Sequence, residues 1–436
     1  MNLSGKRVAV YGLGVTGLAV LEALQSIDLK ELVIVDGAVP NKSDLELLTF
    51  RVKPTLKGES EAQSLLAQMD IILLSPGIPR SKESLTQAHE VGVKVWNEIE
   101  WCAQGYEGKI LAITGTNGKT TTVTLLDHAF KEAGVRVFTG GNIGVPFSSI
   151  YHQRELFDLV LLEMSSFQCE SLESFRPHIA GYLNLFANHG ERYESVEAYR
   201  LAKWDLVKNQ TSADMVFCGP GAGEPAFDMK SSPIKMPSSW KPELDGLVDW
   251  AQVKLVGEHN RQNIWFAWKI FSSYFSFLGE EVPVDTFLKT LYSFSGVEHR
   301  VEVCSPFNNH LVFNDAKSTN WQATKSALKA VLERNLPIVL IVGGQLRGLN
   351  DGPDQELLKF LVEKASHILA MGEAAPFLVK EIEGVVDVKS LEGARVWIEE
   401  NCKQKHALLF SPAFPSFDQF KNYAERGAFF KKEFSN

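Results

Sequence analysis

The residues best suited to chemistry lie in the segment Gly115–Thr120, which reads GTNGKT. The apolar run Ile110–Ile113 before it predicts a buried strand, and Thr121–Ala133 after it predicts a helix. A strand, a glycine turn and a helix together present backbone N–H groups and a helix N-terminus to an anion. In this context Lys119 reaches the terminal phosphates of a nucleotide, and Thr120 supplies an oxygen ligand for Mg²⁺. We therefore interpret the segment as a phosphate-binding loop.

The phosphate loop departs from the strict pattern at one position, and a nearby acid suggests a Mg²⁺ site. The strict phosphate-loop pattern has glycine five residues before Gly118, where this chain has Ile113, so an ordinary glycine turn is the alternative. The segment Phe157–Met164 predicts a nearly apolar buried strand with one acid, Glu163, near its end. A buried carboxylate needs a partner, and a Mg²⁺ shared with Thr120 would be one. A structural salt bridge is the other explanation for Glu163.

A second glycine turn lies near the N-terminus. Gly12–Gly17 follows a predicted strand, and a further strand, Glu31–Val35, ends in Asp36. This spacing matches the dinucleotide fingerprint, in which a glycine turn and helix N-terminus bind a diphosphate and the acid binds a ribose. The geometry serves NAD or a uridine diphosphate equally well. Asp70–Leu74 predicts another strand, and the loop Ser75–Pro79 places Gly77 at the edge of the same sheet.

Polar loops follow most of the remaining predicted strands. Their notable members are Asn142, His189, Lys317, Arg347 and Ser416. Loops at the carboxyl ends of parallel strands share one edge, so Lys317, Arg347 and Ser416 suggest a site for a dicarboxylate or a phosphate. Asn260 and Asn263 share a face in the first turn of a predicted helix, where they either bind adenine or cap the helix.

Three segments carry weaker predictions. Lys203 lies on the predicted helix Val196–Asn209, and its residue type alone indicates a solvated surface charge. Ser165–Gln168 is predicted to be a loop, and Gly219–Gly246 a long surface excursion or weak hairpin.

Strands and helices alternate along the whole chain, which predicts an α/β fold of mostly parallel sheets. We expect three domains: a Rossmann-like N-terminal sheet (residues 1–107), a central mononucleotide-binding domain with the phosphate loop (108–297) and a C-terminal Rossmann-like domain (298–436). The length of 436 residues suits this number.

The bulk composition narrows the function classes. The net charge of −9 disfavours a general nucleic-acid or anionic-membrane role. The five cysteines are scattered and show no metal-binding spacing, which is typical of reduced thiols in the cytosol. The N-terminus passes directly into a strand and no apolar run reaches 18 residues, so we expect a cytoplasmic protein without a membrane span.

Taken in order, these motifs resemble those of the Mur ligases, which build the peptide of bacterial peptidoglycan. The resemblance covers essentially the whole chain. Its closing segment, Ser411–Gly427 (SPAFPSFDQFKNYAERG), is most similar to the branch that adds D-glutamate to UDP-N-acetylmuramoyl-L-alanine. The resemblance implies that ATP phosphorylates the carboxylate of the UDP substrate and that the amine of D-glutamate attacks the acyl phosphate. It also implies that the first domain binds UDP rather than NAD.

The resemblance assigns roles to individual residues. The implied catalytic residues are Lys119, Asn142, Glu163, His189 and Lys203. The implied ATP site comprises Gly115, Thr116, Asn117, Gly118, Lys119, Thr120, Thr121, Asn260, Asn263, Arg300, Asp315 and Lys317. The UDP substrate would contact Gly14, Thr16, Asp36, Gly77 and Asn142. D-glutamate would contact Thr319, Arg347, Ser416, Phe417 and Tyr423. Two Mg²⁺ ions are implied, held by Thr120, Glu163, His189 and Lys203, with Lys203 as a carbamate. The resemblance further leads us to expect a monomer acting on small molecules.

The chain departs from the family pattern at three points. Asn188 stands where the family usually has an acid, Arg347 where it commonly has lysine, and Ala38 where it often has arginine. Three other functions remain to be tested: a related ligase of the folylpolyglutamate type, an NAD-dependent dehydrogenase using Gly12–Gly17, and a nucleotide-binding scaffold. The combination of Lys119, Thr120 and Glu163 disfavours the last two, because hydride transfer needs neither a phosphate loop nor a buried acid. The closing segment Ser411–Gly427 disfavours the first.

Overall fold

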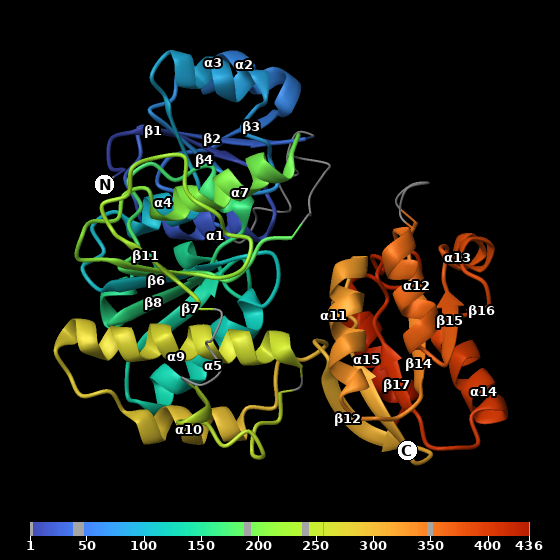
Figure 1. The fold of residues 1–436 in the computed structure, drawn as a ribbon. Helices are drawn as coiled ribbons and strands as arrows, with labels where there is room; N and C mark the ends of the chain where they lie inside the picture. The colour runs from blue at the N-terminus through green and yellow to red at the C-terminus, as the bar shows by residue number, and fades with distance from the viewer. Residues whose placement is uncertain are drawn as a thin grey trace. The chain divides into compact units, whose positions relative to one another are not determined.

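The computed structural model describes residues 3–37, 48–186, 193–237, 244–255, 257–346 and 352–435. Strands and helices alternate through these ranges and the strands form three sheets, which confirms the predicted fold class (Figure 1). The chain divides into two compact units, one of Met1–Glu243 with Phe266–Phe287 and one of Leu244–Trp265 with Leu288–Asn436. The first two sheets belong to the first unit. The domain boundaries at residues 107 and 297 stay predictions.

The first sheet is wholly parallel, with the strand order β3-β2-β1-β4-β5. This is the order of the classic dinucleotide-binding fold up to its fifth strand. Its elements are β1 (Arg7–Tyr11), α1 (Val15–Leu24), β2 (Glu31–Asp36), β3 (Thr55–Gly58), α2 (Glu59–Leu66), β4 (Ile71–Leu74), α3 (Glu83–Glu90), β5 (Lys94–Trp96) and α4 (Glu98–Ala103).

The second sheet is also wholly parallel, with the order β11-β10-β9-β6-β8-β7. Its strands are β6 (Lys109–Thr114), β7 (Val137–Gly141), β8 (Leu159–Glu163), β9 (Ile179–Tyr182), β10 (Met215–Cys218) and β11 (Pro233–Lys235). Its α-helices are α5 (Lys119–Glu132), α6 (Ser166–Cys169) and α7 (Val196–Trp204), and 3₁₀ turns lie at Phe147–Ile150, Arg154–Leu156 and Asp205–Val207. Two further helices follow, α9 (Glu258–Leu278) and α10 (Val284–Ser293).

The third sheet has the order β12-β13-β17-β14-β15-β16, and only the β12–β13 pair is antiparallel. Its strands are β12 (Glu302–Phe307), β13 (His310–Asn314), β14 (Ile338–Gly343), β15 (His367–Met371), β16 (Val385–Lys389) and β17 (Ala407–Phe410). Its helices are α11 (Trp321–Leu332), α12 (Gln355–Lys364), α13 (Ala375–Glu381), α14 (Leu391–Asn401) and α15 (Tyr423–Glu433).

Side chains of the third sheet alternate between two buried faces, as the period of a strand requires. On β14, Leu340 and Val342 pack against α11, α12 and α13. Val339 and Ile341 of the same strand pack against α14 and α15. Helices therefore cover both faces, which explains why the strand sequences are continuously apolar rather than alternating.

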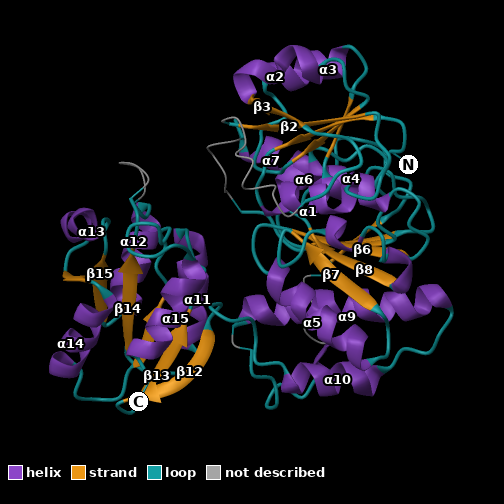
Figure 2. Cartoon of the chain, turned by 180° about the vertical axis from the view of Figure 1, so that it is seen from behind, coloured by secondary structure: helices purple, strands orange, loops and turns teal. Residues whose placement is uncertain are grey.

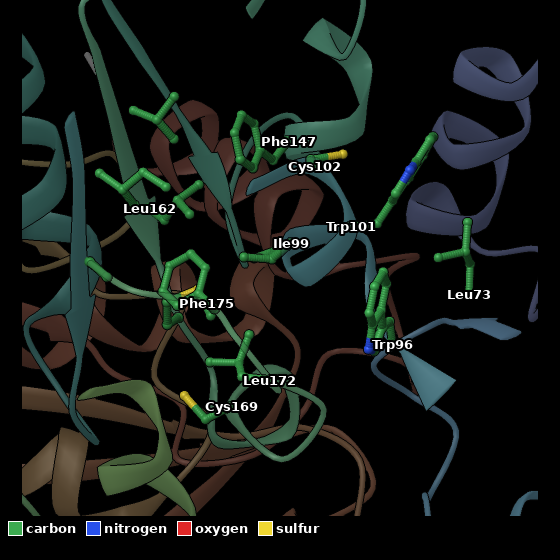
Figure 3. Packing of buried hydrophobic residues seen from close by; sticks show 14 of the residues in the cluster. Leu73, Trp96, Ile99, Trp101, Cys102, Phe147, Leu162, Cys169, Leu172 and Phe175 are labelled. Atoms are coloured by element: carbon green, nitrogen blue, oxygen red, sulfur yellow. The ribbon is translucent and has the colours of Figure 1, made fainter. Parts of the chain in front are cut away.

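The first unit is built in layers, as Figure 2 shows. Helices α2 and α3 cover the outer face of the first sheet, and α1, α4 and α6 lie between the two sheets. One continuous apolar core fills this middle layer, and Figure 3 shows part of it. Its centre includes Trp101, which is fully buried and stacks on Tyr151 with ring centroids 4.3 Å apart. The two glycine turns of the chain are therefore carried by sheets that share a core.

A buried carboxylate in this layer ties helix α4 to the second sheet. Glu100 has 0% exposure and accepts hydrogen bonds from the backbone N–H groups of Glu173, Ser174 and Phe175, each at 2.9 Å. The Ser174 hydroxyl donates to the same carboxylate at 2.5 Å. Hydrogen bonds to a charged acceptor are among the stronger ones in proteins, so this acid fixes the loop before β9.

We expect Glu100→Gln to lower the free energy of unfolding of the first unit by about 2–3 kcal/mol. The amide nitrogen of glutamine cannot accept a hydrogen bond, so one of the buried N–H or O–H donors would lose its partner. Urea denaturation followed by tryptophan fluorescence measures this change. The exposed residue Glu107 offers the matched control, and Glu107→Gln should stay within about 0.5 kcal/mol of the wild type. Equal midpoints for the two variants would contradict the role of Glu100.

Several predicted elements differ from those observed. Ser165–Gln168 is not a loop, since Ser165 caps the short helix α6 through a capping box with Gln168. Within the described part of Gly219–Gly246, β11 runs parallel to β10, so these two strands do not form the suggested hairpin. Among the described residues, no helix combines the length and apolarity that a bilayer crossing requires.

Candidate active site

The phosphate loop connects β6 to α5 as predicted, and its glycines allow the turn. Gly118 occupies the left-handed region with φ of 84° and is the N-cap of α5, a conformation that a side chain would strain. Lys119 is the first residue of the helix, and its Nζ donates to the carbonyls of Gly115 and Thr116 at 2.9 and 3.1 Å. The N-terminus of this 14-residue helix and the ammonium group therefore lie at the same loop.

The segment after β9 forms hydrogen bonds to the phosphate loop. Asn184, just after β9, accepts from the Asn117 backbone N–H at 2.9 Å and donates to the Asn117 carbonyl at 3.1 Å. Its own carbonyl accepts from the Thr116 N–H at 3.0 Å. Asn184 thus holds both central residues of the loop. Sequence reasoning did not single it out, although its place at the end of a predicted strand was a usable signal.

Glu163, the last residue of β8, lies at the centre of the polar contacts beside the loop. Its side chain is 2% exposed; Oε2 accepts from the Thr120 hydroxyl and Oε1 from the Asn142 amide, both at 2.9 Å. The Asn142 backbone N–H also donates to the Glu163 carbonyl at 2.8 Å. Within the described residues no lysine or arginine forms an ion pair with this carboxylate, so the salt-bridge explanation finds no support here. The oxygens of Thr120 and Glu163 are of the type that Mg²⁺ prefers.

Lys203 on α7 is not the surface charge that its residue type indicates. Its side chain is 2% exposed, and Nζ donates to the Gly115 carbonyl at 3.1 Å. The same nitrogen lies 3.4 Å from Thr114 Oγ1 and over the ring of Tyr199, 4.6 Å from its centroid. Burial, reinforced by the charge of Lys119, lowers the pKa of Lys203 to about 7. A substantial fraction of this lysine is therefore a neutral, nucleophilic amine near neutral pH.

The first sheet presents its glycine turn at the carboxyl edge of β1. A Cβ on Gly17 would lie 1.8 Å from the Gly12 carbonyl oxygen, so only glycine fits this close helix–strand approach. The same carbonyl accepts from the Ser75 hydroxyl at 2.8 Å, which joins the turn to the loop that carries Gly77. Asp36 ends β2, the neighbouring strand, and its carboxylate accepts from the Gly37 N–H at 2.8 Å. The glycine turn, Ser75 and Asp36 therefore follow adjacent strands of one sheet.

In the second unit, Asp315 follows β13 and is buried with 5% exposure. Its carboxylate accepts from the Ser411 hydroxyl at 2.7 Å, from the Ser318 hydroxyl and from the Val301 N–H at 3.2 Å. Burial raises the pKa of Asp315 to about 6, although these donors and the charge of Arg300 oppose the shift. The loops after β13 and β17 and the segment before β12 thus meet at one carboxylate.

The segment before β12 carries backbone strain. His299 and Val301 have φ of 63° and 47°, and a positive φ is a genuine outlier for a β-branched residue. A strained backbone conformation persists only where many surrounding contacts hold it, and such residues cluster at ligand sites. Arg300, the implied nucleotide ligand, lies between these two residues.

The two asparagines of α9 lie near the start of the helix and contact each other. The helix begins at Glu258, so Asn260 and Asn263 lie inside its first turns, where both are buried. Asn263 Nδ2 donates to Asn260 Oδ1 at 3.1 Å. Adenine binding and helix capping by these two amides both stay predictions.

Of the implied D-glutamate residues, Thr319 lies on the loop after β13, Ser416 and Phe417 lie on the loop after β17, and Tyr423 begins α15. Ser416 is buried, whereas Phe417 is 66% exposed and Tyr423 is 37% exposed. Lys317 Nζ lies 5.1 Å from the centroid of the Tyr423 ring, a cation–π contact.

Arg426, which sequence reasoning did not single out, ties the same two loops together. It has 0% exposure, and its Nη2 donates to the Ala316 carbonyl at 2.9 Å and to the Phe414 carbonyl at 3.0 Å. A buried cation between two carbonyls fixes the loop after β13 against the loop after β17.

Four residues of the sequence predictions lie outside the described residues. They are the implied metal ligand His189, the implied D-glutamate ligand Arg347 and the departures Asn188 and Ala38. Their roles stay predictions.

Comparison with known proteins identifies the family. Residues 113–220 match the Mur ligase middle domain, and residues 6–97 match the Mur ligase MurD-like N-terminal domain. A UDP-N-acetylmuramoylalanine–D-glutamate ligase of Thermoanaerobacter pseudethanolicus is 30% identical over 99% of this chain and 98% of its own. The chain belongs to the Mur ligase family. The enzyme of the same name from Pelobacter propionicus is 32% identical over 98% of each chain.

Solved structures of Mur ligases share the fold. MurF of Acinetobacter baumannii aligns with a TM-score of 0.60 at 15% identity, covering 97% of this chain and 93% of its own. MurF of Thermotoga maritima, solved in complex with ADP, aligns with a TM-score of 0.57 at 15% identity, covering 99% and 96%. The glycine turn of the first sheet thus lies in a Mur ligase N-terminal domain, which removes the basis for the dehydrogenase alternative.

Proposed function

We propose that the protein is an ATP-dependent ligase that joins D-glutamate to UDP-N-acetylmuramoyl-L-alanine and releases ADP and phosphate. The observation that carries this proposal is the buried Glu163 carboxylate, bonded to Thr120 of the phosphate loop and to Asn142. A scaffold protein has no use for a buried acid at a phosphate loop. The names of the full-length relatives support the identity of the two substrates.

The side chains at the loop fit a nucleotide–Mg²⁺ complex. Thr120 and Glu163 would hold one ion, since a carboxylate buried without a cationic side-chain ion pair suits a hard cation with oxygen ligands. Such an ion, when bound, neutralises charge on the transferring phosphate. Lys119 would bind the β- and γ-phosphates, and the backbone N–H groups of residues 115–121 would surround them. We assign a second ion to His189 and Lys203, as the family resemblance implies.

We further propose that Lys203 carries a carbamate. The neutral amine attacks carbon dioxide, so that an N–C bond forms, one C–O π bond opens and the nitrogen loses a proton to solvent. The buried position of Lys203 favours this reaction, because burial lowers its pKa to about 7 and so raises the fraction of neutral amine. The product places two oxygens that share one negative charge on a long stem beside Gly115 and Thr114, where they would bind a cation.

Other residues of the chain bind and orient the substrates. The turn around Gly14 and Thr16, with Asp36 and Gly77, would bind the uridine diphosphate, and Asn142 would orient the muramoyl carboxyl group. Asn260, Asn263, Arg300, Asp315 and Lys317 would bind adenine and ribose. Thr319, Arg347, Ser416, Phe417 and Tyr423 would bind D-glutamate. For Arg347, a planar guanidinium suits a carboxylate as a bidentate partner.

The chemistry then follows from positioning. A carboxylate oxygen of the UDP substrate attacks the γ-phosphorus of ATP, the bond to ADP breaks and an acyl phosphate forms. The amine of D-glutamate attacks the acyl carbon and loses a proton, phosphate leaves, and an amide remains. Lys119 stabilises the charge that develops during phosphoryl transfer, and Asn142 holds the attacking carboxylate in place.

The decisive test supplies the full-length protein with UDP-N-acetylmuramoyl-L-alanine, ATP, Mg²⁺ and a panel of amino acids, and follows phosphate release. We expect release that depends on D-glutamate and is absent with L-glutamate. Release with another amino acid, or with a folate acceptor in place of the UDP substrate, would assign the chain to a related ligase instead. No acceptor-dependent release would overturn the proposal.

We also propose that the enzyme acts in the cytoplasm as a monomer, in peptidoglycan precursor synthesis. All five cysteines are free thiols, which suits a reducing compartment, and UDP-linked substrates and ATP are available there.

A further inference from the structure

A cluster of nitrogen and sulfur ligands lies on the third sheet, away from every residue assigned above. His367 begins β15, Cys402 follows the end of α14, and His406 immediately precedes β17. One ligand atom from each of the three residues lies within 4.8 Å of the others. Cys402 and His406 are buried, whereas His367 is exposed, so one side of the cluster faces solvent.

The cluster lies at the amino ends of parallel strands. The strands β13, β17, β14 and β15 are neighbours in that order and run in the same direction, so their first residues share one edge. Asp315 and Ser411 follow the opposite ends of β13 and β17. Strands of four to six residues separate the two edges by roughly 15 Å. The cluster is therefore distinct from the proposed nucleotide and D-glutamate sites.

Neighbouring groups already orient the ligands. His406 Nδ1 lies 2.6 Å from the Gln404 carbonyl oxygen, a contact in which the ring donates and leaves Nε2 available for a metal. A backbone carbonyl that fixes the tautomer in this way is the usual support of a metal-binding histidine. His310 Nδ1 accepts from the His406 backbone N–H at 3.1 Å, and the two rings meet edge-on, with centroids 5.7 Å apart. His367 packs against the ring of Trp397 with centroids 5.1 Å apart.

We propose that His367, Cys402 and His406 form a binding site for a thiophilic divalent cation of the Zn²⁺ class. Two imidazoles and a thiolate are the ligands that such ions prefer over Mg²⁺, and three protein ligands with an open position give a tetrahedral site completed by water. Ligand atoms around zinc lie about 3.3–3.7 Å apart. The three ligand atoms lie within 4.8 Å of one another, so side-chain shifts of roughly 1 Å bring them to this spacing.

Metal binding changes the protonation state of the thiol ligand. Burial raises the pKa of the Cys402 thiol. Metal binding therefore breaks the S–H bond, forms an S–metal bond and releases one proton to solvent.

The test uses untagged full-length protein treated with a chelator, desalted and titrated with Co²⁺, whose spectrum reports thiolate ligation. We expect one equivalent to produce a near-ultraviolet thiolate-to-cobalt charge-transfer band and visible bands typical of tetrahedral Co²⁺. One equivalent of Zn²⁺ should bleach both, whereas Mg²⁺ at a large excess should not. A wild-type protein without the charge-transfer band would overturn the proposal.

Variants locate the site. Cys402→Ser should abolish the charge-transfer band, and His367→Gln, at an exposed position that leaves folding intact, should weaken Co²⁺ binding by about tenfold or more. Cys304 is a partly buried thiol of the same unit outside the cluster, so Cys304→Ser should leave the spectrum unchanged. A band that survives Cys402→Ser or disappears in Cys304→Ser would contradict the assignment, with circular dichroism confirming that each variant is folded.

Discussion

Replacing Glu163 by glutamine is expected to reduce kcat/KM for ATP by about 10²–10³-fold, the range seen when one stabilising group is removed from a preorganised polar site. Glutamine keeps the shape of the side chain but removes the charge that a cation at Thr120 needs. Because the amide oxygen can still accept one hydrogen bond, from Thr120 or from Asn142, we expect little unfolding. The decisive measurement is a Mg²⁺ titration of activity, in which the half-saturating Mg²⁺ concentration should rise by at least about tenfold.

Asp127 provides a matched control for this variant. It is a largely buried carboxylate on α5, the same helix that carries Thr120, and it accepts from the Thr139 hydroxyl at 2.6 Å and from Lys131 at 2.8 Å. Asp127→Asn should change stability rather than Mg²⁺ dependence. If Glu163→Gln shows an unchanged Mg²⁺ requirement, or if Asp127→Asn shifts it equally, Glu163 is structural.

Lys203→Ala is expected to reduce kcat by at least about 10²-fold, since it removes the group proposed to hold the second cation beside the phosphate loop. Short carboxylic acids such as acetate should restore part of the activity, because the cavity left beside Gly115 and Tyr199 admits a small anion that replaces the carbamate oxygens. The measurement is kcat as a function of acetate concentration at constant ionic strength. Wild-type enzyme in the same series should show no activation.

Lys208 separates the carbamate proposal from a general loss of positive charge. It lies close by in sequence, and its Nζ donates to the Leu172 carbonyl at 2.7 Å, away from the phosphate loop. Lys208→Ala should keep activity within about threefold of the wild type, as a substitution outside the site. Full activity of Lys203→Ala, or a loss of activity that acetate does not reverse, would overturn the proposal that Lys203 carries a carbamate.

The sequence determined the phosphate loop, the glycine turn of the first sheet and the α/β class. Each rests on a local signal, because a buried strand, a turn glycine and a helix start are specified by residues within about twenty positions. Glu163 belongs to this group as well, since a single acid near the end of an apolar strand is conspicuous without a structure. The sequence did not determine where the short elements begin and end. At α6, a four-residue helix replaces the predicted loop because Ser165 caps it.

Only the tertiary structure decided the environment of Lys203. Its nearest carbonyl partner, Gly115, is 88 residues away in the chain, so neither its burial nor its lowered pKa has a local signature. The same holds for Asn184, whose bonds to Asn117 span 67 residues. The cluster of His367, Cys402 and His406 also required the strand order, because neighbouring parallel strands bring their first residues to one edge regardless of their separation in sequence. Sequence patterns specify elements, whereas packing between them sets burial, and burial sets the chemistry of a lysine or a thiol.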